Sequence, residues 1–286
     1  MPVRTEVAMG TLVTIRVLRS GTEAMQALDR AFAWFHEIED RTTRFNPASE
    51  LRQLTAQTGV AVPASPILYQ AVQFALMVAE SSGGAFDPTV GRQMEARGFN
   101  REYRTGDITG SGGAINYVSY RDLQLDPERK SITLLRPLTL DLGAVVKGLA
   151  VDMAAHELQP FRDFAVDAGG DLYLGGCNER GSPWRIGIRH PRQESGLIAT
   201  VYASDQAVCT SGDYERRRPS VAARHGAAPS IIFWTRAQEY LRVVSRAQRW
   251  SLPRPCWPTR RQRRHLSLDP TVALSSWTGL GWRVCL

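Results

Sequence analysis

The pattern of apolar and polar positions predicts a mixture of strands and helices over the first three quarters of the chain. Thr11–Val17 alternates and is rich in β-branched residues, which is typical of a strand. Between Leu28 and Ile38 large apolar residues recur at helical spacing, which predicts a helix over Glu23–Asp40 with one buried face. A second helix is predicted over Ile67–Ser81, ended by the glycines that follow it.

The remaining predicted elements are shorter and follow no regular rhythm. A short helix is predicted to open at Ser49-Glu50-Leu51, and a longer one to follow Asp141 and run through Ala154. Strands are predicted over Ile132–Leu135, Leu138–Leu140, both arms of the glycine turn in Phe164–Gly176, Trp184–Ile188 and Ala199–Ala203. Because helices and strands are interspersed without a repeating strand–helix–strand unit, the predicted fold class is α+β.

Composition narrows the class of protein. The chain has 286 residues and is 43% hydrophobic, enough to bury a core, which excludes a disordered chain. No apolar run reaches the roughly 18–20 residues that a membrane helix needs, so no membrane span is expected. The first residues contain no apolar segment typical of a signal peptide, and the four cysteines are widely spaced. We therefore expect a reducing, cytoplasmic setting.

Charge is distributed unevenly along the chain. The net charge of +7 invites a nucleic-acid-binding interpretation. However, residues 217–286 carry 13 arginines, no lysine and two acids, a net charge of +11, which leaves −4 for residues 1–216. Five of the seven tryptophans also lie in this tail. Since its arginines form no basic-aromatic recognition pattern, no nucleic-acid partner is predicted, although a basic nucleic-acid-binding extension remains the alternative.

Four glycine-rich turns that each carry an acid are the candidate chemistry of the body. Backbone N–H groups in such turns can hold phosphate oxygens, and a nearby carboxylate can hold Mg²⁺. Each turn alone can equally be a plain turn, and none matches a P-loop or a dinucleotide fingerprint. The turns are Gly84–Asp87, Asp141–Gly148, Asp167–Asp171 and Thr210–Tyr214.

Taken in order, these turns and three shorter motifs resemble one family. The series is Met9-Gly10-Thr11, Phe45-Asn46 with Ser49-Glu50-Leu51, Gly84–Gly91, Leu140–Ala144 with Lys147-Gly148, Ala168–Asp171 and Thr210–Arg216. Over about residues 5–216 it resembles the FAD:protein FMN transferase family, also called ApbE. The resemblance implies the family's α+β fold, FAD as substrate, and Mg²⁺. It also implies transfer of FMN to a Thr or Ser hydroxyl of an acceptor flavoprotein with release of AMP, or hydrolysis of FAD in some members.

The resemblance also implies a set of site residues, although it names no catalytic residue. Ala144 is implied as a Mg²⁺ ligand through its backbone carbonyl, and Thr210–Asp213 as lining the site. The implied FAD contacts are Met9, Phe45, Ala85, Phe86, Asp87, Asp141 and Lys147. Structural alternatives remain open: core packing for Met9 and Phe45, a helix N-cap for Asp141, and a solvated surface position for Lys147. His36 and His190 lack a partner motif and are expected to be structural or exposed.

Two features depart from the family pattern. Asp167 stands where the family usually has Asn, which adds a negative charge beside the expected pyrophosphate site and should weaken FAD binding. After Arg216 the chain also lacks a His-His-Leu-Leu-Asp-Pro-Arg-Thr-Gly type segment and a later Ala-Asp-Ala-Leu-Ser-Thr segment. In the family these supply an acid and a hydroxyl that complete the Mg²⁺ site, and a cofactor histidine.

The genetic code indicates that these segments are encoded in another reading frame. When the codons of Ser230–Glu239 are read in a shifted frame, the codons of Phe233-Trp234-Thr235 can encode only Leu-Asp. The neighbouring codons permit His-His-Leu before this pair and Pro-Arg-Thr-Gly after it. The same shift over Cys256–Arg264 forces Leu-Ala and permits a close approximation of the second segment. We therefore interpret residues 1–216 as a truncated ApbE-like domain and 217–286 as an out-of-frame tail. Such a tail should not pack as a regular part of the domain, and this form should show little transferase activity.

Overall fold

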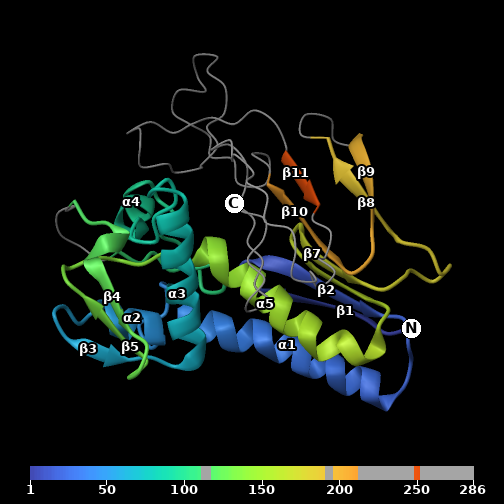
Figure 1. The fold of residues 1–286 in the computed structure, drawn as a ribbon, viewed down its shortest axis with the longest axis horizontal. Helices are drawn as coiled ribbons and strands as arrows, with labels where there is room; N and C mark the ends of the chain where they lie inside the picture. The colour runs from blue at the N-terminus through green and yellow to red at the C-terminus, as the bar shows by residue number, and fades with distance from the viewer. Residues whose placement is uncertain (111–116, 191–195, 212–247, 252–286) are drawn as a thin grey trace, which may run out of the picture.

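A six-stranded antiparallel sheet forms the larger layer of the fold. The computed structural model describes residues 1–110, 117–190, 196–211 and 248–251. Neighbouring strands of this sheet are antiparallel throughout (Figure 1). In spatial order they are β1 (Val3–Ala8), β2 (Thr11–Val17), β6 (Phe164–Ala168), β7 (Asp171–Gly175), β10 (Gln206–Ser211) and β11 (Gln248–Ser251).

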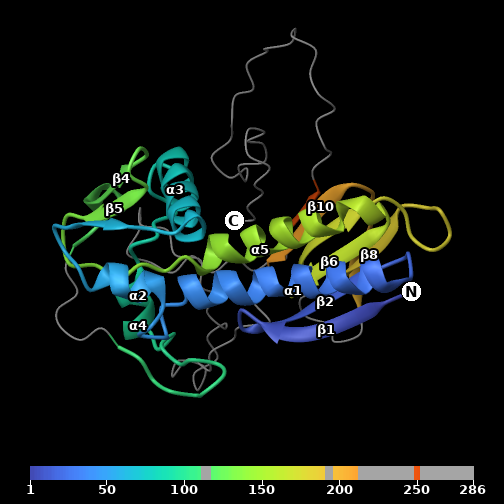
Figure 2. The same cartoon turned by 90° about the horizontal axis from the view of Figure 1, so that it is seen from below.

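Two long helices cover one face of this sheet. Helix α1 (Thr22–Thr42) and helix α5 (Gly143–Leu158) lie side by side along it (Figures 1 and 2). Every second residue of β2 points inward, so Val13 and Ile15 are fully buried beneath the apolar face of α1, which includes Phe32. The apolar residues that repeat every two positions in the strand thus pack against those that repeat every 3.6 positions in the helix, and together they form one core.

A second, smaller apolar cluster covers part of the other face, over β7 and β10. The hairpin of β8 (Trp184–Arg189) and β9 (Leu197–Ala203) supplies Trp184 and Ala203, which pack with Leu174 and Val208 of the large sheet. The Trp184 indole N–H donates to the Gly175 carbonyl oxygen at 2.8 Å, so the buried polar atom of this ring is satisfied.

The remaining elements form a separate lobe at one end of α1 (Figure 1). Its small sheet has the order β3 (Ala61–Pro63), β5 (Ser131–Leu134), β4 (Leu123–Asp126). Helix α3 (Pro66–Ser81) and the short helices α2 (Glu50–Thr55) and α4 (Gly91–Ala96) accompany it. Two 3₁₀ turns, Tyr120–Asp122 and Gln159–Phe161, complete the described elements. The α+β class predicted from the sequence is confirmed.

Most predicted elements are found within one or two residues, but one strand prediction is wrong. Leu138–Leu140 is not a strand: only Thr139 makes an isolated parallel bridge, to Val90. Leu138 and Leu140 are instead buried at 2% and 0% exposure, so their apolar character reflects core packing of a connecting segment. Periodicity cannot separate a three-residue buried loop from a strand.

The tail expectation is wrong for four residues. Gln248–Ser251 pairs with β10 as the last strand of the large sheet, where we expected no part of 217–286 to join it. Main-chain pairing needs no particular side chain, so an unpaired strand edge accepts an available segment. The rest of the tail and Gly212–Arg216 lie outside the described residues. Across the described chain, none of the helices combines the length and apolar character needed to cross a bilayer.

An ion pair joins the middle of α1 to the last turn of α5 and makes stability depend on pH. Glu157 accepts hydrogen bonds from Arg30 Nε at 2.9 Å and Trp34 Nε1 at 3.1 Å. Partial burial acts to raise the Glu157 pKa, but the hydrogen bonds from Arg30 and Trp34 and the Arg30 charge together hold the pKa below its ordinary value. The stability contributed is therefore present above the unfolded pKa and is lost as pH falls through the folded one.

Glu157→Gln should accordingly lower the free energy of unfolding at pH 7 by about 0.5 kcal/mol, as for a partly exposed pair. The difference from the unaltered chain should shrink below about pH 5, where the glutamate itself becomes protonated. Urea unfolding at pH 7 and pH 3.5 measures it. A difference that is constant across this range would show that the Glu157 charge does not carry the effect.

Candidate functional site

The amino-terminal end of α5 is where the predicted site residues converge. The helix begins at Gly143 after Leu142, whose side chain cannot cap it. Asp141 Oδ1 accepts the Gly143 N–H at 2.9 Å, so Asp141 caps from one residue before the N-cap position. The capping role left open from the sequence is therefore present, shifted by one residue, and it leaves the second carboxylate oxygen for another partner.

That partner is Arg44, which sequence analysis missed. Arg44 Nε donates to Asp141 Oδ2 at 3.0 Å, and the Arg44 guanidinium carbon lies 4.4 Å above the centre of the Phe45 ring. Phe45 is half-buried beneath this cation. Phe45 and Asp141, which are 96 residues apart in the sequence, are thus brought together through the Arg44 side chain. The signal available in the sequence was a basic residue beside a predicted flavin contact.

The Ala85-Phe86-Asp87 turn lies against the same segment. The Asp141 N–H donates to the Pro88 carbonyl oxygen at 2.8 Å, and Val90 bridges Thr139. Ala85 and Phe86 are half-buried, whereas Asp87 is only 3% exposed.

The Asp87 carboxylate is occupied by Thr89 of its own loop and by the main chain at Tyr120. It accepts from the Thr89 N–H at 2.9 Å, the Thr89 hydroxyl at 2.7 Å and the Tyr120 N–H at 3.2 Å. A buried carboxylate with three donors fixes the loop that carries it. Ala85 and Phe86 are therefore the members of this turn with surface left for a ligand.

Met9 sits at the tip of the β1–β2 hairpin. Its backbone is in the left-handed region at φ 53°, and its N–H donates to Glu39 Oε2 at 2.9 Å. The side chain packs partly against the core, in line with the structural alternative, while the turn remains at the surface. Glu39, 8% exposed, is a second residue that sequence analysis missed.

Glu39 also ties the hairpin tip to the loop that follows α4. It accepts from the Tyr103 hydroxyl at 3.1 Å and from Arg104 Nη2 at 2.5 Å. Burial raises the pKa of Tyr103; the hydrogen bond from Arg104 opposes this rise and the Glu39 carboxylate adds to it. Tyr103 therefore stays protonated and continues to donate to Glu39 at neutral pH.

Lys147 is not a solvated surface residue. Its Nζ lies 2.5 Å from Asp171 Oδ2, and the two side chains are 27% and 17% exposed. Lys147 comes one turn after Gly143 on α5, and Asp171 follows directly on the Gly169-Gly170 turn. This pair joins the glycine turn of the large sheet to the helix that carries Asp141.

The Gly169-Gly170 turn is closely surrounded by hydroxyl groups. A Cβ at Gly169 would lie 2.0 Å from Thr11 Oγ1, and one at Gly170 would lie 2.7 Å from Thr210 Oγ1. Thr210 donates to the Gly170 carbonyl oxygen through its N–H at 3.0 Å. Thr11 and Thr210 thus flank the turn, so the part of the Thr210–Asp213 motif that the structure describes lies in the site.

Asp167 takes part in the same turn. Its Oδ1 accepts the Gly170 N–H at 3.1 Å, a bond that the carbonyl oxygen of an asparagine could also accept. The departure from the family pattern therefore preserves the turn and changes only the charge.

The described residues do not make up a metal site by themselves. No three His, Cys, Asp or Glu side chains of the described segments lie close enough together to hold a metal ion. Ala144 is exposed in the first turn of α5, where its carbonyl is one oxygen donor. A Mg²⁺ site normally uses six oxygens, with carboxylates among them, so further ligands would be required.

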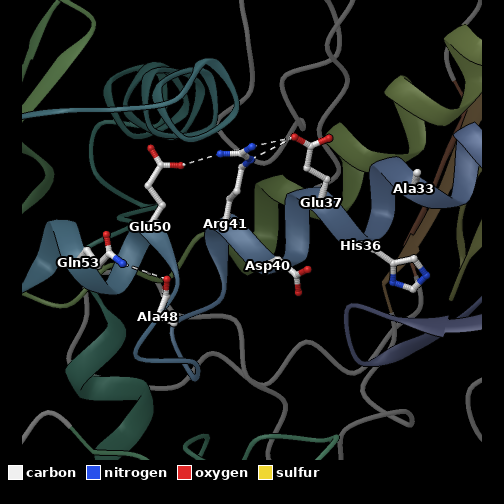
Figure 3. A pocket seen from close by; sticks show the side chains of 8 residues that line it. All are labelled: Ala33, His36, Glu37, Asp40, Arg41, Ala48, Glu50 and Gln53. Atoms are coloured by element: carbon white, nitrogen blue, oxygen red, sulfur yellow. Dashed lines mark hydrogen bonds and ion pairs between the residues drawn. The ribbon is translucent and has the colours of Figure 1, made fainter.

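A hollow on the outer surface of α1 is separate from the predicted site residues. It measures about 670 Å³ and contains none of the predicted FAD contacts. Figure 3 shows its lining residues: Ala33, His36, Glu37, Asp40, Arg41, Ala48, Glu50 and Gln53. Arg41 is held by Glu37 at 3.0 Å and Glu50 at 3.6 Å, so the hollow offers mainly carboxylates and would repel a pyrophosphate.

The comparisons with known proteins agree with this fold. The sequence profile of the ApbE family matches residues 9–230, so the chain belongs to the ApbE family.

Its relatives carry one name. The chain is 31% identical over 243 residues to the FAD:protein FMN transferase of Treponema pallidum, covering 74% of this chain and 65% of that protein. With the protein of the same name from Vibrio cholerae the identity is 28% over 222 residues, covering 72% and 64%. The chain thus spans slightly less than two thirds of the length of these curated relatives.

A solved structure confirms the fold. The crystal structure of the ApbE protein of Thermotoga maritima superposes with a TM-score of 0.68 at 25% identity, covering 81% of this chain and 75% of that chain.

Proposed function

We propose that this chain is built as a FAD:protein FMN transferase. Such an enzyme binds FAD and transfers its FMN part to a Thr or Ser hydroxyl of an acceptor flavoprotein. One observation carries the proposal: motifs spread over residues 9–171 meet around the first two turns of α5. Asp141 caps that helix and Lys147 lies one turn further. Phe45 is joined to Asp141 through Arg44, and the Met9 hairpin is bonded to Glu39 near the end of α1.

The residues suit an FAD molecule with its pyrophosphate near α5. The helix start provides backbone N–H groups and the positive end of the dipole, and Lys147 provides a cation. Phe45 and Phe86 offer aromatic surface for a ring system. When FAD binds, the Lys147 ammonium would either move from Asp171 to a phosphate oxygen or contact both.

The proposed reaction is a phosphoryl transfer. The acceptor hydroxyl oxygen bonds to the phosphorus on the FMN side of the pyrophosphate, the bond from that phosphorus to the bridging oxygen breaks, and AMP leaves. The hydroxyl proton is released. A chain that binds FAD but meets water in place of the acceptor hydroxyl would instead yield free FMN and AMP.

Mg²⁺ belongs to the proposal through the family resemblance, with Ala144 as one ligand. The printed sequence lacks the two later segments that complete the metal site in the family. We therefore propose that the form described is impaired in transfer while its FAD-binding residues are in place. A non-catalytic FAD-binding protein, or a nonfunctional frameshift product, is the second candidate. The cytoplasmic location remains a prediction.

The binding half of the proposal is tested with the two lysines of the chain. Lys147→Ala should weaken FAD binding at least about tenfold, because it removes a charged hydrogen-bond donor from the proposed pyrophosphate site. Lys130→Ala, which removes an equal charge over the Tyr69 ring in the distant lobe, should leave FAD affinity unchanged. Titration of FAD followed by flavin fluorescence measures both. Equal loss in the two variants, or no binding by the unaltered chain, would contradict the proposal.

A further inference from the structure

We propose that Arg44 is a positioning residue, which fixes Phe45 and Asp141 in the geometry that FAD binding requires. The inference rests on the proposed function for its ligand, but the contacts that carry it belong to the free protein. Arg44 is not proposed to touch the reacting atoms.

Arg44 joins its own segment to two others. Its Nε donates to Asp141 Oδ2 at 3.0 Å at the start of α5, and its guanidinium lies 4.4 Å from the Phe45 ring centre. Its Nη2 donates to the Phe99 carbonyl oxygen, and its Nη1 lies 3.8 Å from Glu95 Oε1 on α4. The planar guanidinium sets the directions of these donors, so the three segments are held in one arrangement.

Burial makes this arrangement rigid. The Arg44 side chain is 8% exposed, and the Asp141 side chain is 21% exposed. Charges removed from water interact more strongly, and losing one partner leaves the other uncompensated. Asp141 without Arg44 would retain the Gly143 N–H on one oxygen and turn the other toward solvent or toward a bound phosphate.

The pair is not explained by stability alone. A buried ion pair is weak evidence for stability, because desolvation offsets the attraction. Within the described segments, Arg44 Nη1 also has no hydrogen-bond partner, an arrangement that costs free energy. A side chain that gains little stability and yet joins two predicted FAD contacts is best explained by the geometry it imposes.

The chain offers a control for the loss of an arginine charge. Arg30 Nε joins the middle of α1 to Glu157 in the last turn of α5 at 2.9 Å, and the Arg30 side chain is 56% exposed. Arg30→Gln removes one surface arginine bond between the helices, whereas Arg44→Gln removes all contacts of a buried arginine. A general effect of losing an arginine charge predicts weaker FAD binding in both variants.

The experiment combines FAD titration with amide hydrogen exchange on the free protein. Arg44→Gln should weaken FAD binding about tenfold or more, the size expected when one charged hydrogen bond is lost, and Arg30→Gln should not. On an Asp141→Asn background, Arg44→Gln should add less than about threefold, because Arg44 acts mainly through Asp141. In the free protein, Arg44→Gln should speed exchange in residues 43–49 and 139–146, and Arg30→Gln should not.

The outcomes separate the two proposals. If the unaltered chain binds no FAD, the proposed function fails, and the exchange data still decide whether Arg44 orders its two segments. Unchanged exchange in both segments would overturn the positioning role. So would an equal loss of FAD affinity in the Arg30 and Arg44 variants, or full additivity of Arg44→Gln with Asp141→Asn.

Discussion

Restoring the shifted reading frame after Arg216 should raise Mg²⁺-dependent FMN transfer by about 100-fold or more over the chain as printed. The restored segments would supply the acid and hydroxyl that complete the metal site in the family. A metal at the transferring phosphate is worth several kcal/mol of charge stabilisation, which sets the expected size. AMP release, measured by chromatography, and flavin retained on the denatured acceptor polypeptide report the reaction.

Two controls accompany this comparison. Chelation of Mg²⁺ should remove the gain in the restored form and leave the printed form unchanged. FAD binding should differ far less than transfer, because the binding residues we propose all precede Arg216. Full transfer activity in the printed form would show that the tail supplies what we expect it to lack.

Gly169→Ala should lower the free energy of unfolding by about 2–4 kcal/mol, from the combined cost of a strained backbone and an overpacked contact. Gly169 has a φ of 60°, and its added Cβ would lie 2.0 Å from Thr11 Oγ1 and 3.0 Å from Thr11 Cβ. Either Thr11 or the glycine turn must move, and the turn carries Asp171 and its bond to Lys147. Urea unfolding measures the stability, and FAD titration should show weaker binding at temperatures where the variant stays folded.

Gly59→Ala separates the two causes. Gly59 has a φ of 74° but nothing within 4 Å of an added Cβ, so only the backbone cost of about 1–2 kcal/mol should appear. Removing the Thr11 hydroxyl and methyl in a Thr11→Ala, Gly169→Ala double variant should recover part of the loss. Equal destabilisation by Gly59→Ala and Gly169→Ala would show that the contact with Thr11 is not limiting.

The sequence predicted the elements with strong periodicity and the order of the motifs, but not the contacts that join them. Helices α1 and α3 were predictable because each has an apolar face, whereas α5 is apolar nearly all round and was predicted from the apolar run that follows Asp141. The strand β1, with exposed residues such as Val3 and Val7, was not predicted, and Leu138–Leu140 was assigned to a strand because a short buried run has no distinctive period. In both cases the local sequence pattern does not distinguish the structure that forms.

The site shows a related division. Phe45, Asp141 and Lys147 were identified by resemblance, while Arg44 and Glu39 were missed because their importance depends on partners far along the chain. Nothing in the local sequence around Glu39 distinguishes it from the exposed acids of the same helix. The hairpin turn of Met9 and the loop of Tyr103 and Arg104, which meet at this carboxylate in the fold, give it a role.

The pairing of β2 with β6 has a consequence for synthesis of the chain. Val13 pairs with Ala168 and Val17 with Phe164, so the amino-terminal hairpin gains its second neighbour only after most of the domain has left the ribosome. Until then one edge of β2 stays open, and contacts between such distant residues form slowly. The FAD site that we propose, which uses residues next to both of these strands, is therefore assembled late. Nascent chains that stop before residue 168 should present an unpaired hairpin edge to chaperones.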